Sequence, residues 1–141
     1  MTVEMANPSA RPRRVPRSVA AVFVGSLVGA ALSLGTDQVL HVLQVYPPWG
    51  QPMHEPGLNL LALSYRLPFQ VIGGWVIARL APYAPMGHAL TGGIIGLVLS
   101  ALGAVAAINM DLGPAWYPIA LALSAVPTTW LGAVLQKGEL R

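Results

Sequence analysis

The stretch LLALSYRLPFQVIGGWVIARL, residues 60–80, decides the fold class, because it is mostly apolar and yet carries an arginine, Arg66, well inside the run. A helix rises about 1.5 Å per residue, so about 20 residues cross a hydrocarbon core of about 30 Å. Backbone polar groups in lipid must be satisfied within the segment, which favours a helix. The stretch therefore predicts a transmembrane helix that holds a charge.

The composition of the whole chain points to the same solvent. Of its 141 residues, 55% are hydrophobic and 9% are charged, whereas soluble domains carry roughly 25% charged residues. A chain of this size cannot bury so much apolar surface in water, which favours a bilayer. The absence of cysteine excludes disulfides and Cys-based zinc sites.

Four apolar runs predict an all-α membrane protein with four transmembrane helices. We expect these helices at about residues 18–46, 58–80, 87–108 and 116–136, with prolines in the connections. Residues 1–17 are polar and basic and are expected to form a disordered cytoplasmic tail, and residues 137–141 a cytoplasmic C-terminal tail. A cleaved signal peptide is the alternative for the first run, but the run is long and ends without a clean small-x-small cleavage site.

The positions of Lys and Arg predict the orientation, because basic residues accumulate on the cytoplasmic side. The two connections at residues 47–57 and 109–115 contain neither Lys nor Arg, so we expect them outside. Both termini are then cytoplasmic. With this orientation seven of the eight basic residues lie inside, namely Arg11, Arg13, Arg14, Arg17, Arg79, Lys137 and Arg141.

Two pairs of segments suggest an internal repeat. GSLVGAALS, residues 25–33, matches GGIIGLVLS, residues 92–100, at two glycines, a leucine and a serine. PFQVIGG, residues 68–74, matches PTTWLGA, residues 127–133, at a proline and a glycine. Both hairpins would enter from the cytoplasm, which makes the repeat parallel. Chance similarity between apolar segments is the alternative.

Each copy of the repeat carries small residues spaced four apart, and this spacing puts them on one helix face. Such faces let helix backbones approach closely in lipid. We expect the first and third helices to cross on these faces, and contact between two chains is the alternative. The predicted packing residues are Gly25, Gly29, Ser33, Gly92, Gly96 and Ser100.

Charge inside a membrane segment occurs only in the first hairpin, at Asp37 and Arg66. Asp37 lies nine residues before Tyr46, and Arg66 lies nine residues after Gly57. Antiparallel helices would therefore hold the two charges at one depth, in the outer part of the membrane. Because an unpaired arginine in lipid costs at least a few kcal/mol, we expect Arg66 to pair with Asp37.

Spacing of four residues adds His41 to the face of Asp37 and Gln70 to the face of Arg66. The predicted intramembrane network therefore consists of Asp37, His41, Tyr65, Arg66 and Gln70. Its role has two readings. It is either a buried clasp that fixes the pairing of two helices, or part of an outward-facing cavity that binds an anion, a lipid head group or a proton. A third possibility is that Arg66 reaches to lipid phosphate.

Patterns typical of catalysis are weak. His54 and Glu55 lack the second histidine of a zinc-protease helix, and a metal site that joins them to His41 is disfavoured. No phosphate-binding glycine loop, Ser/His/Asp set or pair of carboxylates is visible, so we predict no catalytic residue, metal or cofactor. The basic residues do not indicate nucleic acid either. The expected partners are the lipid bilayer and, through helix contacts, a second copy or another membrane protein.

Several short motifs stand out along the chain. They are GTD at residues 35–37, His41, YPPWG at 46–50, YR at 65–66, ARLAP at 78–82, PMGHA at 85–89 and GPAWYP at 113–118. Together they resemble the motifs of a group of small bacterial membrane proteins of unassigned function. The resemblance covers roughly residues 18–136 and implies a four-helix, multi-pass protein of the bacterial inner membrane.

The resemblance brings no substrate or catalytic residue. We therefore expect a non-enzymatic accessory protein, with a small oligomeric transporter or channel-like protein as the alternative. Small multidrug exporters match poorly, because their first helix carries a lone glutamate, whereas this chain has an aspartate with a nearby arginine.

Overall fold

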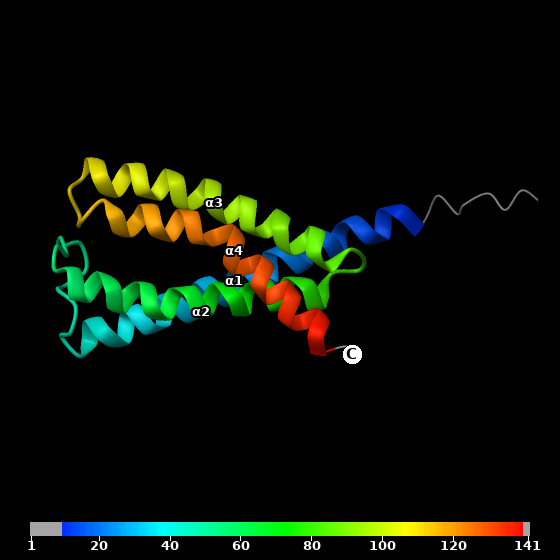
Figure 1. Cartoon of the computed structure of the whole chain (residues 1–141), viewed down its shortest axis with the longest axis horizontal. Helices are drawn as coiled ribbons and strands as arrows, with labels where there is room; N and C mark the ends of the chain where they lie inside the picture. The colour runs from blue at the N-terminus through cyan, green and yellow to red at the C-terminus, as the bar shows by residue number, and fades with distance from the viewer. Residues whose placement is uncertain (1–9, 140–141) are drawn as a thin grey trace, which may run out of the picture.

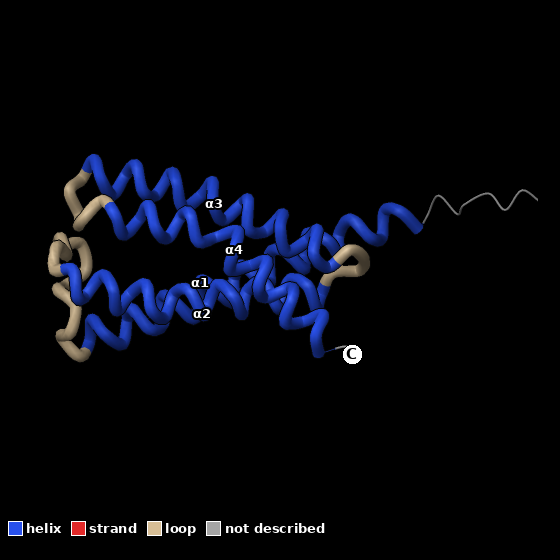
Figure 2. Tube along the Cα trace, in the orientation of Figure 1, coloured by secondary structure: helices blue, strands red, loops and turns tan. Residues whose placement is uncertain are grey.

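The computed structural model describes the backbone of residues 10–139 and side chains from residue 15 onward within that range. This part of the chain contains four helices and no strand (Figures 1 and 2). They are α1 (Ala10–Val42), α2 (Pro56–Leu80), α3 (Pro85–Asn109) and α4 (Trp116–Glu139). Each is long and apolar enough to cross a membrane. The predicted all-α membrane fold with four helices is therefore confirmed.

The start of α1 differs from its predicted position. The helix begins at Ala10, so residues 10–17 are helical where we predicted a disordered tail. Residues 1–9 of that predicted tail lie outside the described residues. Arginine is a strong helix former, and Pro12 falls in the first turn, where a backbone N–H has no intrahelical acceptor. At the other terminus α4 runs to Glu139, so the predicted C-terminal tail is wrong for residues 137–139, and the last two residues lie outside the description.

α1 ends at Val42, four residues earlier than predicted, because a left-handed residue closes the helix. Gln44 has φ 60°. Its N–H donates to the carbonyl of His41 at 3.0 Å, and the N–H of Val45 donates to the carbonyl of Leu40 at 2.9 Å. This is the Schellman arrangement, in which glycine usually occupies the left-handed position. Glutamine gives no such signal in the sequence, so the helix end was missed.

α3 ends in the same way. Asp111 has φ 50°, and its N–H donates to the carbonyl of Ile108 at 3.1 Å. The N–H of Leu112 donates to the carbonyl of Ala107 at 3.0 Å. Both connections at this end of the molecule therefore begin with a Schellman cap without glycine.

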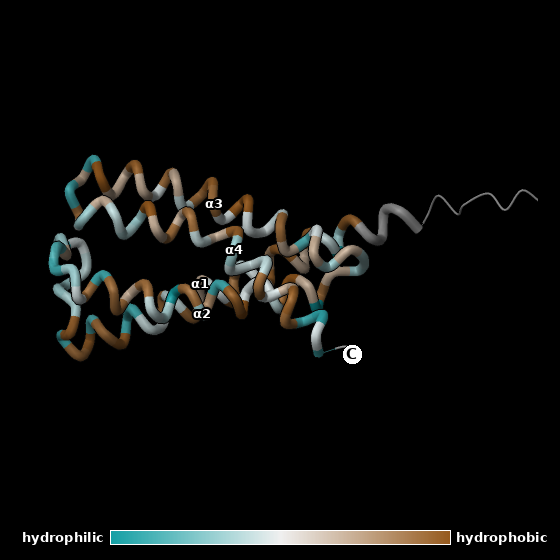
Figure 3. The backbone as a smooth tube through the Cα atoms, viewed as in Figure 1, coloured by the Kyte–Doolittle hydropathy of each residue, from teal (hydrophilic) through white to brown (hydrophobic). Residues whose placement is uncertain are grey.

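The helices form two antiparallel hairpins, α1–α2 and α3–α4 (Figure 1). The start of α1, the α2–α3 connection and the end of α4 lie at one end of the molecule, and the other two connections lie at the opposite end. Hydrophilic residues gather toward the ends, whereas the helices between are mainly apolar (Figure 3). Large apolar side chains face outward; Phe23, Leu99 and Leu123 are 64%, 63% and 67% exposed. This exposure fits a surface covered by lipid.

Glycines lie where the helix backbones approach each other most closely. Helix α2 takes part in the two closest of these backbone contacts, one with α1 and one with α4. A Cβ on Gly25 of α1 would lie 2.7 Å from the carbonyl oxygen of Gly73 in α2. A Cβ on Gly132 of α4 would lie 2.5 Å from the backbone nitrogen of Trp75 in α2. Helix α2 is therefore the central helix, with α1 and α4 packed directly on its backbone.

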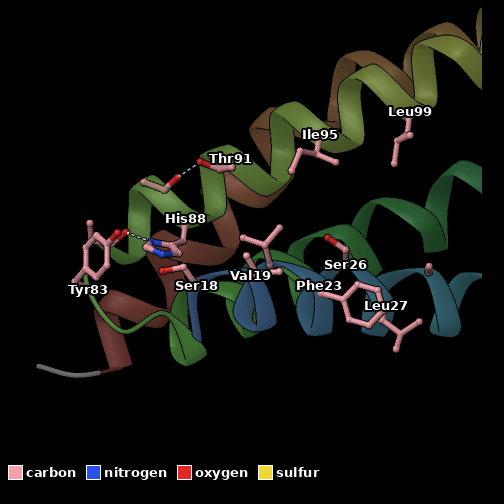
Figure 4. Close-up of a pocket in the computed structure, with 14 residues that line it drawn as sticks. Ser18, Val19, Phe23, Ser26, Leu27, Tyr83, His88, Thr91, Ile95 and Leu99 are labelled. Atoms are coloured by element: carbon pink, nitrogen blue, oxygen red, sulfur yellow. Dashed lines mark hydrogen bonds between the residues drawn. The ribbon is translucent and has the colours of Figure 1, made fainter. Parts of the chain in front are cut away.

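The predicted crossing of α1 and α3 on their small-residue faces is wrong. Gly25 and Gly29 of α1 approach the backbone of α2, and Gly96 of α3 faces α4. The physical reason is that α2 and α4 present small residues of their own, whereas bulky side chains separate α1 from α3. An apolar groove of about 820 Å³ lies between those two helices, with Ser18 and His88 toward one end (Figure 4). Its bulky lining includes Val19, Phe23, Leu27, Ile95 and Leu99.

Candidate functional site

Arg66 of α2 and Asp37 of α1 meet inside the first hairpin. The Nη2 of Arg66 donates to the Oδ2 of Asp37. Asp37 is 4% exposed, whereas the Arg66 side chain keeps 25% of its surface exposed. The predicted pairing is confirmed. It explains how an arginine is accommodated within an apolar run, because a carboxylate at the same depth neutralises it.

Two tyrosines complete this group. The Tyr65 hydroxyl donates to the Oδ1 of Asp37, and the hydroxyls of Tyr46 and Tyr65 are hydrogen-bonded at 2.8 Å. Burial raises the pKa of the Tyr46 hydroxyl. Because Tyr65 donates its single hydroxyl proton to Asp37, the Tyr46 hydroxyl donates to Tyr65. Each oxygen of the Asp37 carboxylate thus has a donor. We call Asp37, Tyr46, Tyr65 and Arg66 the polar clasp.

Tyr46 is a member that the sequence reasoning missed. The sequence places Tyr46 nine residues after Asp37, at the expected end of a straight helix. The Schellman cap after Val42 turns the chain instead and brings Tyr46 back against α2, where it is 5% exposed. A buried tyrosine needs a hydrogen-bond partner, and Tyr65 provides it.

His41 makes no hydrogen bond to a side chain of the clasp, in contrast to the prediction, although its ring packs edge-on against Tyr46 with centroids 5.3 Å apart. Its Nδ1 lies 2.7 Å from the backbone carbonyl oxygen of Asp37. Its ring stacks on Trp49 with centroids 3.9 Å apart, and the Trp49 Nε1 donates to Gln38 at 2.9 Å. A backbone carbonyl four residues earlier is the nearest acceptor for a side chain on a helix, and it competes with the carboxylate. His41 therefore anchors the α1–α2 connection.

Gln70 is also separate from the clasp. Its side-chain amide is hydrogen-bonded to the hydroxyls of Thr128 at 2.8 Å and Ser124 at 3.2 Å, both in α4. The sequence placed Gln70 correctly on the face of Arg66, but it could not show that α4 packs closely on α2. Gln70 thus links the two hairpins, and Ser124 and Thr128 are polar partners that the sequence reasoning did not assign.

The two hairpins meet again where the α1–α2 and α3–α4 connections lie. The N–H of Met53 donates to the carbonyl of Leu112 at 2.7 Å. The Asn59 side chain, 2% exposed, donates to the carbonyls of Met53 and Glu55 at 3.0 and 2.9 Å. His54 also lies 3.8 Å from Asp111. Backbone and side-chain bonds therefore join the loops of the two hairpins.

A cavity of about 360 Å³ lies between the hairpins beside Gln70, lined by residues from all four helices. Arg66 reaches into it from the clasp, and Gln70 also lines it. The Nε of Arg66 is buried and has no hydrogen-bond partner among the described residues. The small-residue faces that were predicted to pack on each other line this cavity instead. Its lining includes Gly25, Gly29, Ser33, Gly92, Gly96 and Ser100.

The arrangement limits the chemistry of the clasp. A general base must reach the proton that it removes, directly or through one water. The Asp37 carboxylate is enclosed, and both of its oxygens accept from Arg66 or Tyr65. The clasp is therefore arranged to hold two helices together, and the face of Arg66 toward the cavity is the part that a ligand can reach.

No family model matches the chain, and neither a curated protein nor a solved structure matches it.

Proposed function

We propose that this small membrane protein is a non-enzymatic accessory protein that acts through helix contacts with a second copy or with another membrane protein. The observation that carries the proposal is that the charges of the clasp are paired with each other. Asp37 is 4% exposed, and its partners Arg66 and Tyr65 belong to the same hairpin. Charges arranged in this way set the geometry of α1 on α2. The outward surfaces of these helices are then held in one arrangement for a partner.

We place the protein in a bacterial inner membrane with both termini in the cytoplasm. The motif resemblance supports the compartment, and the distribution of Lys and Arg supports the orientation. The fold is compatible with both, because the start of α1 and the end of α4 lie at the same end of the molecule (Figure 1).

Labelling of single cysteines tests this orientation cleanly, because the chain has no cysteine of its own. Gln51→Cys lies in the α1–α2 connection and Lys137→Cys near the end of α4, and both positions are exposed. With a membrane-impermeant maleimide on intact spheroplasts, we expect labelling of the first variant and, for the second, labelling only after permeabilisation. The reverse pattern would place the termini outside and contradict the proposal.

The alternative is a small oligomeric transporter or channel-like protein, and one observation favours it. Arg66 lines the cavity between the hairpins, and its Nε has no partner among the described residues. Intramembrane ionisable residues often mark ion or substrate paths. Against this reading, Asp37 does not line the cavity, and His41 is stacked against Trp49.

Flux through reconstituted liposomes separates the two roles. We expect purified protein in liposomes with an enclosed pH dye to show the same proton and chloride leak as protein-free liposomes, because the clasp charges are already paired. A saturable flux that rises with the amount of protein would contradict the accessory role and favour the alternative. The Arg66→Gln variant would then show whether that flux depends on the cavity face of the arginine.

A further inference from the structure

We propose that the cavity between the hairpins is a binding site for an uncharged ligand group that presents a carbonyl oxygen. The inference concerns the 360 Å³ space bounded by all four helices. It does not require the accessory role, because an accessory protein and a transporter can both hold such a ligand.

The cavity is lined by equivalent positions of the two sequence repeats, which supports a constructed site rather than a packing defect. Ser33 and Ser100, which are equivalent in the first pair of repeated segments, both line it, and so do Gly29 and Gly96. Gln70 and its counterpart Thr129 in the second pair line it as well. The Schellman caps at Gln44 and Asp111 share the same offset of 67 residues as the serines. We infer that the repeats surround this space.

Polar side chains that hold a donor without a partner line the cavity from three helices. The Nε of Arg66 in α2 is buried and unpaired among the described residues. Ser33 of α1 lines the cavity at 7% exposure, and neither its hydroxyl nor that of Ser100 in α3 is hydrogen-bonded to another described residue. Buried donors are rarely left unsatisfied in folded proteins. An acceptor atom in the cavity would satisfy the hydroxyls of Ser33 and Ser100 and would lie beside the Arg66 side chain.

The charge balance argues that this acceptor is uncharged. Arg66 is the one charged residue among the described residues that line the cavity. Asp37 already neutralises its charge. A carboxylate or phosphate would therefore add an uncompensated negative charge within the membrane, which is expensive. A carbonyl oxygen accepts hydrogen bonds from guanidinium and hydroxyl groups without that penalty.

Size and wall chemistry narrow the ligand further. The volume lies within the range of about 300–1,000 Å³ that is typical of small-molecule sites. Apolar walls from Leu34, Ile77 and Leu121 accompany the donors, so the ligand should be apolar apart from its carbonyl. Two sources share this chemistry. One is the ester carbonyl of a bilayer phospholipid, and the other is a free lipid-soluble carbonyl compound such as a benzoquinone.

Thermal unfolding of the full chain in lipid-free dodecyl maltoside tests the site. Three probes are added separately: a diester phosphatidylcholine, the dialkyl ether phosphatidylcholine with the same chains, and a short-tailed benzoquinone. We expect the diester lipid or the quinone to raise the Tm by about 5 °C at saturation, and the ether lipid to leave it unchanged. A response to the diester lipid indicates a bilayer ligand, and a response to the quinone indicates a free compound.

A cavity-filling variant locates the response. A Cβ on Gly96 would meet Ala125 Cβ at an ordinary 3.7 Å, so Gly96→Leu should place its side chain in the cavity and abolish the shift. Gly103→Leu is the matched control, because Gly103 lies on the same helix with open space around it. The control should respond like the wild type.

A second variant keeps the test decisive if Gly96→Leu does not fold. The double change Ser33→Ala and Ser100→Ala removes two donors without adding volume, and we expect about tenfold more probe for a half-maximal shift. The inference is overturned if neither carbonyl probe raises the Tm, or if the ether lipid acts as well as the diester. It is also overturned if the shift survives both Gly96→Leu and the double serine variant.

Discussion

Asp37→Asn is expected to lower the free energy of unfolding by about 3–5 kcal/mol, because it leaves the guanidinium of Arg66 without its counter-ion. Arginine keeps its charge in proteins and cannot escape the penalty by losing a proton. The amide of asparagine still accepts from one donor, but it no longer neutralises the cation. Arg66 is partly enclosed in the membrane region, and no second carboxylate pairs with it in the described part of the chain, so the loss is not recovered locally.

Arg66→Gln should be less damaging than Asp37→Asn. In this variant Tyr65 remains hydrogen-bonded to the Asp37 carboxyl group, so one of its two donors is kept. The double variant Asp37→Asn with Arg66→Gln leaves no buried charge, so it should recover most of the stability lost in Asp37→Asn. A coupling energy of about 2 kcal/mol or more would identify a structural pair.

Thermal unfolding in detergent measures the cycle, with Glu55→Gln as the control. Glu55 is exposed in the α1–α2 connection, and its substitution should change stability by less than about 0.5 kcal/mol. If the two single effects simply add in the double variant, the residues are not energetically coupled. The clasp would then not hold the hairpin together, and the accessory role would lose its main support.

Gly132→Leu is expected to destabilise the protein by about 3 kcal/mol or more, by forcing α4 away from α2. A Cβ at this position would lie 2.5 Å from the Trp75 nitrogen and 2.9 Å from the carbonyl carbon of Gly74. These atoms are backbone, so no change of side-chain rotamer relieves the overlap. The hydrogen bonds from the Ser124 and Thr128 hydroxyls to the amide oxygen of Gln70 cross the same interface and should weaken with it.

The control for this variant is Gly138→Leu, six residues later in α4, where nothing lies within 4 Å of a Cβ. Leucine favours a helix over glycine by roughly 0.5–1 kcal/mol, so the control should be neutral or slightly more stable. The Tm of both variants in detergent gives the comparison. Equal Tm values for the two would show that α2 and α4 do not depend on this backbone contact.

For Arg66 the sequence predicted the partner correctly. Counting residues from the loop was enough to pair it with Asp37, because depth in a hairpin follows directly from helix rise. The same counting failed for Tyr46, since the left-handed turn at Gln44 has no glycine to announce it. It also failed for His41 and Gln70, whose correct helix faces were known but whose partners lie in a loop and in α4.

The small-residue faces of α1 and α3 were likewise predicted only in part. Their spacing correctly indicated that Gly25 and Gly29 sit where backbones approach closely. The choice of partner depended on all four helices at once, because α2 offers Gly73 and Gly74 to two neighbours, whereas α3 is separated from α1 by bulky side chains. Periodicity describes a single helix and carries no information about which helix lies opposite it.

The sequence by itself determined the class of solvent, the four membrane helices and the pairing of the one intramembrane arginine. These features follow from hydropathy, helix rise and the high free energy of an unpaired charge in lipid. Each of these can be evaluated within a single hairpin, without knowing which helices surround it. Only the tertiary structure decided that α2 is central, that Tyr46 joins the clasp, and that small residues line a cavity. The place of Tyr46 depends on the left-handed turn at Gln44. The central position of α2 and the cavity arise from contacts between hairpins, where the shape of several helices together sets the distance between any two.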